Sequence, residues 1–253
     1  YPSPGAMRTP PQSPSRPPAG QCCPHKLVAF LAAQAPDDTP PPRMHPLTDD
    51  GASWAIHAPK FRPLPDDAFE RLWVSMPDDP PTIRMMGRVV RAPRRQRSFG
   101  VDYAFSGGVT RSAPLDTEPE VHKLAQLFAD AVRAAGGDAR PLKDGAARVG
   151  ALINAYDAKR NDYIGLHSDD ERGLRPGWPI FSLSWGQARR FRLIPRLQRG
   201  RPLAGVRALS LTLDGGDLLV MGGTCQRTHK HEVPKPSMAE REDPRGTRRL
   251  NLT

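Results

Sequence analysis

Residues 209–221 read LSLTLDGGDLLVM, and this stretch indicates the class of fold. Leu209, Leu211 and Leu213 alternate with Ser or Thr, which is the period of a β-strand with one buried face. The Asp-Gly-Gly at 214–216 supplies the small residues of a tight turn, and a second apolar run follows at 218–220. Two strands joined by a tight turn are therefore predicted.

The same alternation occurs upstream, as Phe, Leu and Trp in residues 181–185 and as Phe and Leu in residues 191–193. Strand patterns with glycine-rich turns dominate from about Arg148 onward, and helical patterns precede them. This order is typical of an α+β fold in which helices pack against one side of a β-sandwich or jelly roll.

Two helices are predicted before these strands. Residues 65–76 open with Pro-Asp and repeat apolar residues on one face. A second helix is predicted from Thr117, which is spaced to form a capping box with Glu120, to the Gly-Gly pair at 136–137. Between the helices, residues 82–106 indicate short strands and a loop rich in Arg and Pro.

The first 60 residues differ from the rest in composition. Thirteen of the 30 prolines fall in residues 1–50, without a convincing apolar period. We therefore predict a disordered leader over residues 1–60 that is dispensable for catalysis, helices and short strands over 61–147, and a strand-rich core over 148–253. Residues 1–36 contain no Asp or Glu, so an organelle-targeting leader is an alternative.

The formal net charge of +10 favours a polyanionic partner, although a merely basic surface explains it equally well. The arginines gather in two sets, namely Arg84, Arg88, Arg91, Arg94, Arg95 and Arg97, and Arg189, Arg190, Arg192, Arg196, Arg199 and Arg201. The three cysteines form neither a disulfide framework nor a zinc knuckle, which fits a reducing compartment. No apolar run approaches the ~20 residues that span a bilayer, so no membrane-spanning helix is expected.

The residues that suggest chemistry are His167-Ser168-Asp169 and a later histidine, His231. A non-haem iron site needs two imidazoles and one carboxylate on one face of the metal. Residues i and i+2 of a strand point the same way, so His167 and Asp169 can hold one ion while Ser168 turns aside. The third ligand must then come from a distant strand.

This motif is a weak signal on its own, because a solvated surface pair explains an isolated His-x-Asp better than a metal site does. His231 also has an ordinary interpretation as a surface histidine after a turn. His229 has the same strand parity and is a rival ligand. We prefer His231 because the strands placed around it direct its side chain inward, and because of the family resemblance that follows.

Further motifs occur in order along the chain: Asn154-x-Tyr156, His167-Ser-Asp169-Asp170-Glu171, Pro-Ile-Phe-Ser-Leu-Ser-Trp-Gly at 179–186, Leu-Leu-Val-Met at 218–221, His231-Glu-Val-Pro234-Lys235 and Arg249-Leu-Asn251-Leu-Thr253. Upstream lie Pro93-Arg94-Arg95-Gln96, Phe99-Gly100 and Tyr103-Ala-Phe105-Ser106-Gly107. Together they resemble the AlkB-type iron(II)- and 2-oxoglutarate-dependent dioxygenases, in particular the animal members that repair nucleic acids. The resemblance covers residues 82–253. It implies a double-stranded β-helix (jelly-roll) core with buttressing N-terminal helices and a nucleotide-recognition lid.

By this resemblance, His167, Asp169 and His231 bind Fe(II) and form the catalytic centre. The centre would use O2 and the cosubstrate 2-oxoglutarate, with ascorbate as an expected activator. The implied cosubstrate-binding residues are Asn154, Tyr156, Arg249, Asn251 and Thr253. Arg249 would pair the distal carboxylate through a bidentate fork. Taken singly, these residues have ordinary interpretations as turn, core or surface positions.

The resemblance also implies a substrate-binding set, namely Met86, Gly87, Arg88, Arg94, Arg95, Tyr103, Phe105, Asp170 and Glu171. Its aromatic residues would stack on a flipped base, and its arginines would meet phosphates. Asp170 would favour a cationic methylated base over the neutral normal base. Met86 stands where a duplex-repairing relative has an aromatic wedge, which favours single strands as substrate.

The implied function is oxidative demethylation of N-alkylated bases of the 1-methyladenine and 3-methylcytosine type in DNA or RNA, by a monomer in the nucleus. Three alternatives stay open: a catalytically impaired nucleic-acid-binding module, a 2-oxoglutarate oxygenase acting on RNA marks or protein, and a zinc hydrolase with the same ligands. The family pattern continues past Thr253 with an aromatic residue and a second arginine. The natural chain is therefore expected to extend further.

Overall fold

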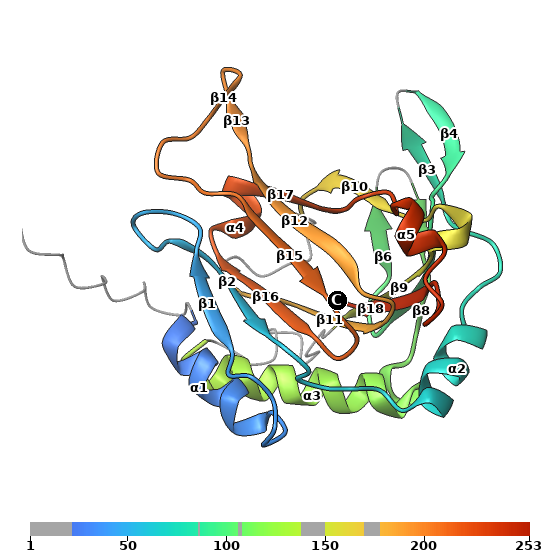
Figure 1. Cartoon of the computed structure of the whole chain (residues 1–253), viewed down its shortest axis with the longest axis horizontal. Coiled ribbons are helices and arrows are strands. Elements are labelled where there is room, and N and C mark those ends of the chain that lie inside the picture. Colours follow the sequence, from blue (N-terminus) through green and yellow to red (C-terminus); the bar gives the residue numbers. More distant parts are fainter. Residues whose placement is uncertain (1–21, 86, 106–107, 138–149, 170–177) are drawn as a thin grey trace, which may run out of the picture.

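A pair of β-sheets forms the centre of the computed structural model, which describes residues 22–85, 87–105, 108–137, 150–169 and 178–253 (Figure 1). The larger sheet has the strand order β1 (Arg43–Pro46), β2 (Ser53–Ala58), β16 (Leu218–Gly223), β11 (Ile180–Gly186), β18 (Arg248–Leu252), β9 (Ala151–Asp157), β5 (Arg95–Phe99) and β8 (Ser112–Ala113). The smaller sheet has the order β10 (Ile164–His167), β17 (His229–Val233), β12 (Arg189–Pro195) and β15 (Leu209–Leu213). All these strand pairs are antiparallel except β5 with β8.

The chain crosses from one sheet to the other in two runs of consecutive strands. Strands β9 and β11 belong to the larger sheet, whereas β10 and β12 belong to the smaller one. The pattern repeats with β15 and β17 in the smaller sheet and β16 and β18 in the larger one. The two strands predicted within residues 209–221 are thus present as β15 and β16, but their turn joins the two sheets.

This turn depends on a glycine and on two carboxylates. Gly216 has a φ of +90°, a conformation that disfavours any residue with a Cβ. Asp214 Oδ1 accepts a hydrogen bond from the Gly215 backbone N–H (2.8 Å), and Asp217 Oδ2 accepts one from the Asp214 N–H (3.0 Å). The chain therefore reverses without leaving these amides unsatisfied.

Three helices cover the face of the larger sheet that is opposite the smaller sheet (Figure 1). They are α1 (Pro24–Gln34), α2 (Asp66–Val74) and α3 (Pro119–Ala134). Leu31, Leu72 and Val121 from these helices join Leu250 of β18 in one buried cluster. A second cluster, which includes Leu219 of the larger sheet and residues of β12, β15 and β17, lies between the sheets. The layers are therefore helices, larger sheet and smaller sheet, as an α+β fold predicts.

The prediction of a disordered leader over residues 1–60 is wrong for residues 22–60. Residues 24–34 form helix α1, and β2 pairs along its whole length with β16, from Ser53 opposite Gly223 to Ala58 opposite Leu218. β2 is buried on both faces, so its sequence does not alternate and gives no period-2 signal. Residues 1–21 lie outside the described residues.

Both predicted helices are present, but the capping box is wrong. The residue before α3 is Glu118, which makes no side-chain cap. Thr117 instead ends a 3₁₀ turn, η1 (Leu115–Thr117), and its hydroxyl donates to the Pro114 carbonyl (2.7 Å). Glu120 accepts a hydrogen bond from Arg71 of α2 (2.9 Å). The spacing is compatible with a cap, but Thr117 bonds a local carbonyl and Glu120 bonds an arginine of another helix instead.

Three short hairpins and three short helical turns complete the described structure. The hairpins are β3 (Thr82–Met85) with β4 (Arg88–Arg91), β6 (Tyr103–Phe105) with β7 (Gly108–Thr110), and β13 (Leu197–Gln198) with β14 (Arg201–Pro202). The helical turns are η2 (Ala158–Arg160), α4 (Cys225–Thr228) and α5 (Met238–Arg241). Hairpins β3–β4 and β13–β14 extend from the side of the molecule opposite the three long helices (Figure 1). None of the helices within the described ranges is long and apolar enough to cross a bilayer.

Candidate active site

His167, Asp169 and His231 form a compact group between the two sheets. His167 lies opposite His231 in the β10–β17 pair, and their ring centroids are 4.1 Å apart. Asp169 Oδ1 lies 3.6 Å from His167 Nε2, and its Oδ2 lies 3.4 Å from His231 Nε2. Within the described ranges, these are the only three His, Cys, Asp or Glu residues whose ligand atoms all lie within 4.8 Å of one another as a metal site requires.

Two of the three positions follow from strand geometry. Residues directly opposite each other in an antiparallel pair have Cβ atoms about 5 Å apart, which brings the two imidazoles together. The argument from i, i+2 parity does not apply to Asp169, because β10 ends at His167. Asp169 reaches the group from the residues after the strand, so other contacts must fix its position.

The protonation of His167 and Asp169 suits metal binding. His167 Nδ1 donates to the Gly165 carbonyl (2.9 Å), which leaves the lone pair of Nε2 directed at the other ligands. Burial, with a contribution from His231, lowers the pKa of His167 to about 4, so the imidazole is neutral at pH 7. Burial alone would raise the pKa of Asp169, but its hydrogen bond to His231 and the neighbouring histidines outweigh burial and lower it. Two imidazoles and one carboxylate fit a divalent metal ion.

The rival ligand His229 is occupied elsewhere. Its Nε2 donates to the Arg207 carbonyl (2.8 Å), and its Nδ1 accepts from the Thr228 hydroxyl (2.8 Å). Both ring nitrogens therefore have protein partners. The choice of His231 over His229 agrees with this geometry.

Strands β9 and β18 bring the predicted cosubstrate residues together. Arg249 pairs with Tyr156, and Asn251 pairs with Asn154. Leu250 and Leu252 of β18 belong to the buried cluster that includes the helix residues. Alternate residues of a strand point to opposite faces, so Arg249 and Asn251, together with their partners in β9, face the smaller sheet. Asn251 donates to Ser182 Oγ (2.9 Å) and accepts from Thr253 Oγ1 (3.0 Å), so Thr253 lies in the same row.

Arg249 is almost completely buried, yet it keeps donors for an anion. Its Nη1 donates to the carbonyls of Gln187 and Leu213, and its Nη2 donates to Ser184 Oγ. Its Nε has no partner among the described residues. Burial, with a contribution from Arg189, lowers the pKa of Arg249 to about 10, so the guanidinium is charged at pH 7. A buried cation with a free donor suits a carboxylate ligand.

The sequence interpretation missed Arg189 as a site residue and placed it only in the second arginine set. Arg189 is 1% exposed, and its Nη1 has no partner in the described part of the chain. Its other donors reach the carbonyls of Asp162 (3.2 Å) and Pro234 (2.7 Å), and Nε lies 3.4 Å from Glu240 Oε1. A signal was available, because Arg189 has the same strand parity as the buried Phe191 and Leu193 in β12.

The predicted substrate residues lie in several different parts of the structure. Arg94 is buried and donates to Asn154 Oδ1 (3.0 Å), so its predicted phosphate contact does not fit its position. Arg95 lies over the Trp73 ring, 4.5 Å from its centroid. The exposed residues Gly87 and Arg88 lie in the β3–β4 hairpin, and Tyr103 and Phe105 lie in β6. Met86, Asp170 and Glu171 lie outside the described residues.

The other arginines divide between ion pairs and open surface. Arg97 pairs with Glu118 (2.9 Å), and Arg192 pairs with Glu232 (2.8 Å). Positions 84, 88, 199 and 201 are exposed, and they lie on or between the strands of the two projecting hairpins. Four exposed arginines of the two sets therefore lie on these two hairpins.

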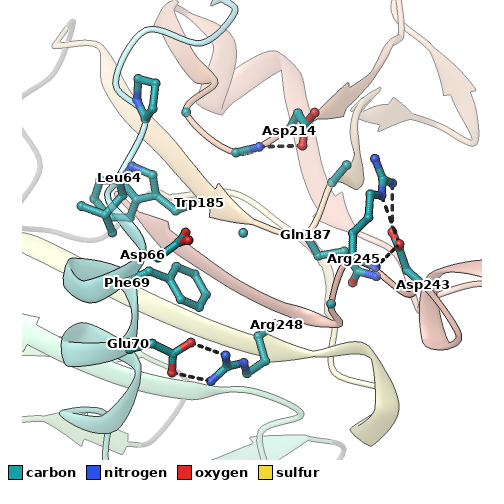
Figure 2. Close-up of a pocket in the computed structure, with 16 residues that line it drawn as sticks. Leu64, Asp66, Phe69, Glu70, Trp185, Gln187, Asp214, Asp243, Arg245 and Arg248 are labelled. Carbon is teal, nitrogen blue, oxygen red and sulfur yellow. Dashed lines mark hydrogen bonds and ion pairs between the residues drawn. The ribbon is translucent and has the colours of Figure 1, made fainter.

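A cavity of about 390 Å³ lies at the C-terminal end of β11 (Figure 2). None of the three metal-ligand candidates lines it. Its arginines already pair with carboxylates, Arg248 with Glu70 and Arg245 with Asp243. The cavity therefore gives no reason to place the active site away from the His-Asp-His group.

Comparison with known proteins defines the class of enzyme. The family profile described as the 2OG-Fe(II) oxygenase superfamily matches residues 66–253, and the chain belongs to this family as an AlkB-like enzyme. Fe(II) and 2-oxoglutarate are the cofactors typical of the family, and His167, Asp169 and His231 are the candidate iron ligands in this chain.

Three of its relatives carry the same name, DNA oxidative demethylase ALKBH2. The Arabidopsis thaliana protein is 28% identical over 255 residues, covering 90% of this chain and 74% of the relative. The Mus musculus and Homo sapiens proteins are 32% and 31% identical over 156 residues. These alignments cover 60% of this chain but only 59% and 54% of the mouse and human relatives. The solved structure of OsALKBH1 matches with a TM-score of 0.48 and 19% identity, over 78% of this chain and 94% of that one.

Proposed function

We propose that the protein removes N-alkyl groups oxidatively from nucleobases of the 1-methyladenine and 3-methylcytosine type in DNA or RNA. The observation that carries the proposal is that the His167, Asp169 and His231 group and the buried Arg249 both lie between the two sheets, where Arg249 Nε has no partner among the described residues. The name of the ALKBH2 relatives supports the same substrate class. We further propose that the alternating strands of the two sheets form a jelly roll and that residues 82–110 serve as the nucleotide-recognition lid.

The residues of the chain have three tasks in this reaction. Fe(II) with 2-oxoglutarate and O2 supplies the oxidation of an N-methyl group to a hydroxymethyl group, which leaves as formaldehyde. His167, Asp169 and His231 hold the metal, and Arg249 orients the distal carboxylate of the cosubstrate. The sheet interior keeps bulk water away from the reacting atoms.

Nucleic acid is the proposed partner because of where the exposed arginines lie. Hairpins β3–β4 and β13–β14 both carry exposed arginines and extend from the same side of the molecule (Figure 1). Phosphate contacts from such arginines would make binding weaker as salt concentration rises. Base flipping would give the enzyme access to a methyl group that pairing otherwise hides. We propose the nucleus as the location on the same grounds.

The direct test is mass spectrometry of a 3-methylcytosine oligonucleotide after incubation with the protein, Fe(II), ascorbate and 2-oxoglutarate. We expect a loss of 14 Da, the mass of one CH2, together with one equivalent of succinate. The unmethylated oligonucleotide is the matched control and should not change. Succinate formation without demethylation would indicate another substrate. Absence of succinate in all reactions would favour a binding module or a hydrolase.

Replacing Arg249 should weaken cosubstrate binding more than nucleic-acid binding. A hydrogen bond to a charged group contributes ~1.5–3 kcal/mol, so Arg249→Ala should raise the Kd for 2-oxoglutarate roughly 10–100-fold. Isothermal titration in the presence of Mn(II) measures this constant directly. The exposed Arg245 provides a control, because Arg245→Ala removes the same charge far from the interior. An unchanged Kd in a folded Arg249→Ala protein would exclude the proposed role.

A further inference from the structure

The hydrogen bonds between β10 and β17 do not fix the position of Asp169. The pairing of β10 with β17 is irregular between Ile164 and His167, and β10 ends at His167. A carboxylate that must face two imidazoles at once needs a fixed backbone, because side-chain rotation alone leaves many other directions open. The contacts around residues 168 and 169 therefore decide whether the ligand group is preformed.

Gln226 contacts the backbone of Asp169. The Asp169 N–H donates to Gln226 Oε1 at 3.0 Å, and Gln226 Nε2 donates to Met221 Sδ at 3.7 Å. The opposite amide orientation would place an NH2 group against the Asp169 N–H, so the side chain has one favourable orientation. Gln226 belongs to α4, the turn that leads directly into β17 and His231. One continuous segment therefore supplies the third ligand and the group that holds the second.

Ser168 and Arg196 fix the same loop from the other side. Ser168 Oγ donates to the His229 carbonyl (2.9 Å) and accepts from Arg196 Nη2 (2.7 Å). Arg196 Nη2 also lies 3.2 Å from the Gln226 carbonyl and donates to it. Arg196 thus connects the end of β12, the ligand loop and α4. Its side chain spans the three segments that must keep their relative positions for the ligands to converge.

We propose that Gln226 is a positioning residue for the metal ligand Asp169, and that Arg196 supports it through Ser168. The proposal rests on the metal centre of the proposed function. Partners that orient metal ligands commonly affect metal affinity or activity ~10–100-fold. The contacts of Gln226 reach the backbone of the ligand, so their loss would leave the carboxylate chemically intact but less often directed at the metal.

The test measures binding of Mn(II) alone, by electron paramagnetic resonance of the free ion, without cosubstrate or nucleic acid. Gln226→Met keeps the length and volume of the side chain but removes the acceptor, and should raise the Kd for Mn(II) ~10–100-fold. Gln226→Glu keeps an acceptor oxygen and should retain an affinity much nearer to that of the parent protein. The neighbouring exposed Arg227 provides the matched control, because Arg227→Met changes the same turn without touching Asp169.

A second measurement separates positioning from a general structural effect. The visible spectrum of the Co(II) form depends on the number and arrangement of ligands, and should change in Gln226→Met but not in Arg227→Met. If Gln226→Met does not fold, Ser168→Ala replaces it, since the loss of one hydroxyl should also weaken Mn(II) binding. Unchanged Mn(II) affinity and an unchanged Co(II) spectrum in a folded variant would overturn the proposal.

These measurements distinguish a failure of this inference from a failure of the proposed function. A parent protein that binds no Mn(II) would contradict the metal centre itself, and this inference would fail with it. If the parent protein and folded Gln226→Met bind Mn(II) equally tightly, only the role of Gln226 is contradicted. Tight Mn(II) binding that depends on Gln226, without demethylation of oligonucleotides, would leave the positioning role intact and exclude the proposed substrate.

Discussion

Replacing His231 by alanine is expected to abolish the metal-dependent conversion of 2-oxoglutarate to succinate. His231 supplies one of three protein ligands, and its Nε2 lies 3.4 Å from Asp169 Oδ2. Changes to groups that merely orient a ligand already cost ~10–100-fold, so loss of the ligand itself should cost more than about 100-fold in metal affinity. Succinate measured by NMR, together with Mn(II) binding, reports both losses. His167→Ala and Asp169→Ala should behave in the same way.

Two other histidines provide the comparison. His122 is on the surface of α3 and hydrogen-bonds Gln126, so His122→Ala should keep turnover and stability. His229→Ala removes contacts to Arg207 and Thr228 and should lower the melting temperature, while the folded protein still binds metal. If His229→Ala lost Mn(II) binding and His231→Ala kept it, the assignment of the third ligand would be wrong.

The core strands could be predicted because they have one buried face. Leu209, Leu211 and Leu213 alternate with polar residues in β15, and in the structure these leucines are buried or half-buried whereas the polar residues between them are exposed. The same reasoning failed for Ser53–Ala58, because β2 is covered by helix α1 on one face and by the smaller sheet on the other. A strand that is buried on both faces has no polar side to reveal its period. The prolines around it then suggested disorder.

The metal ligands of the site could be predicted because histidine and aspartate side chains are themselves the groups that bind a metal ion. His167, Asp169 and His231 were identified from their order and from the family resemblance, and they converge. Arg189 could have been found from its parity in β12, although charge alone suggested the surface. No sequence signal pointed to Gln226, because its role depends on the distance between α4 and the end of β10, which only the fold determines.

Removing residues 1–60 should prevent folding. Leu27 and Leu31 of α1 and Ile56 of β2 are fully buried, and each such side chain contributes ~1.5–3 kcal/mol. Together they are comparable with the ~5–15 kcal/mol that separates a folded domain from its unfolded state. The deletion would also remove every partner on one side of β16, leaving an open sheet edge. We expect the shortened chain to aggregate and to show no cooperative thermal unfolding by circular dichroism.

A chain that begins at residue 22 is the control for this deletion, because it keeps α1, β1 and β2 with all their described contacts. A single substitution tests the same burial with a smaller effect. Leu31→Ala should lower the free energy of unfolding by ~2–5 kcal/mol, because the surrounding residues cannot fully close the cavity that it leaves. Exposed Leu197 in the β13–β14 hairpin should tolerate the same substitution with little effect. If residues 61–253 alone unfolded cooperatively at the temperature of the longer chain and still bound Mn(II), the helix and two strands would not belong to the core. The leader would then extend to residue 60, as the sequence first suggested.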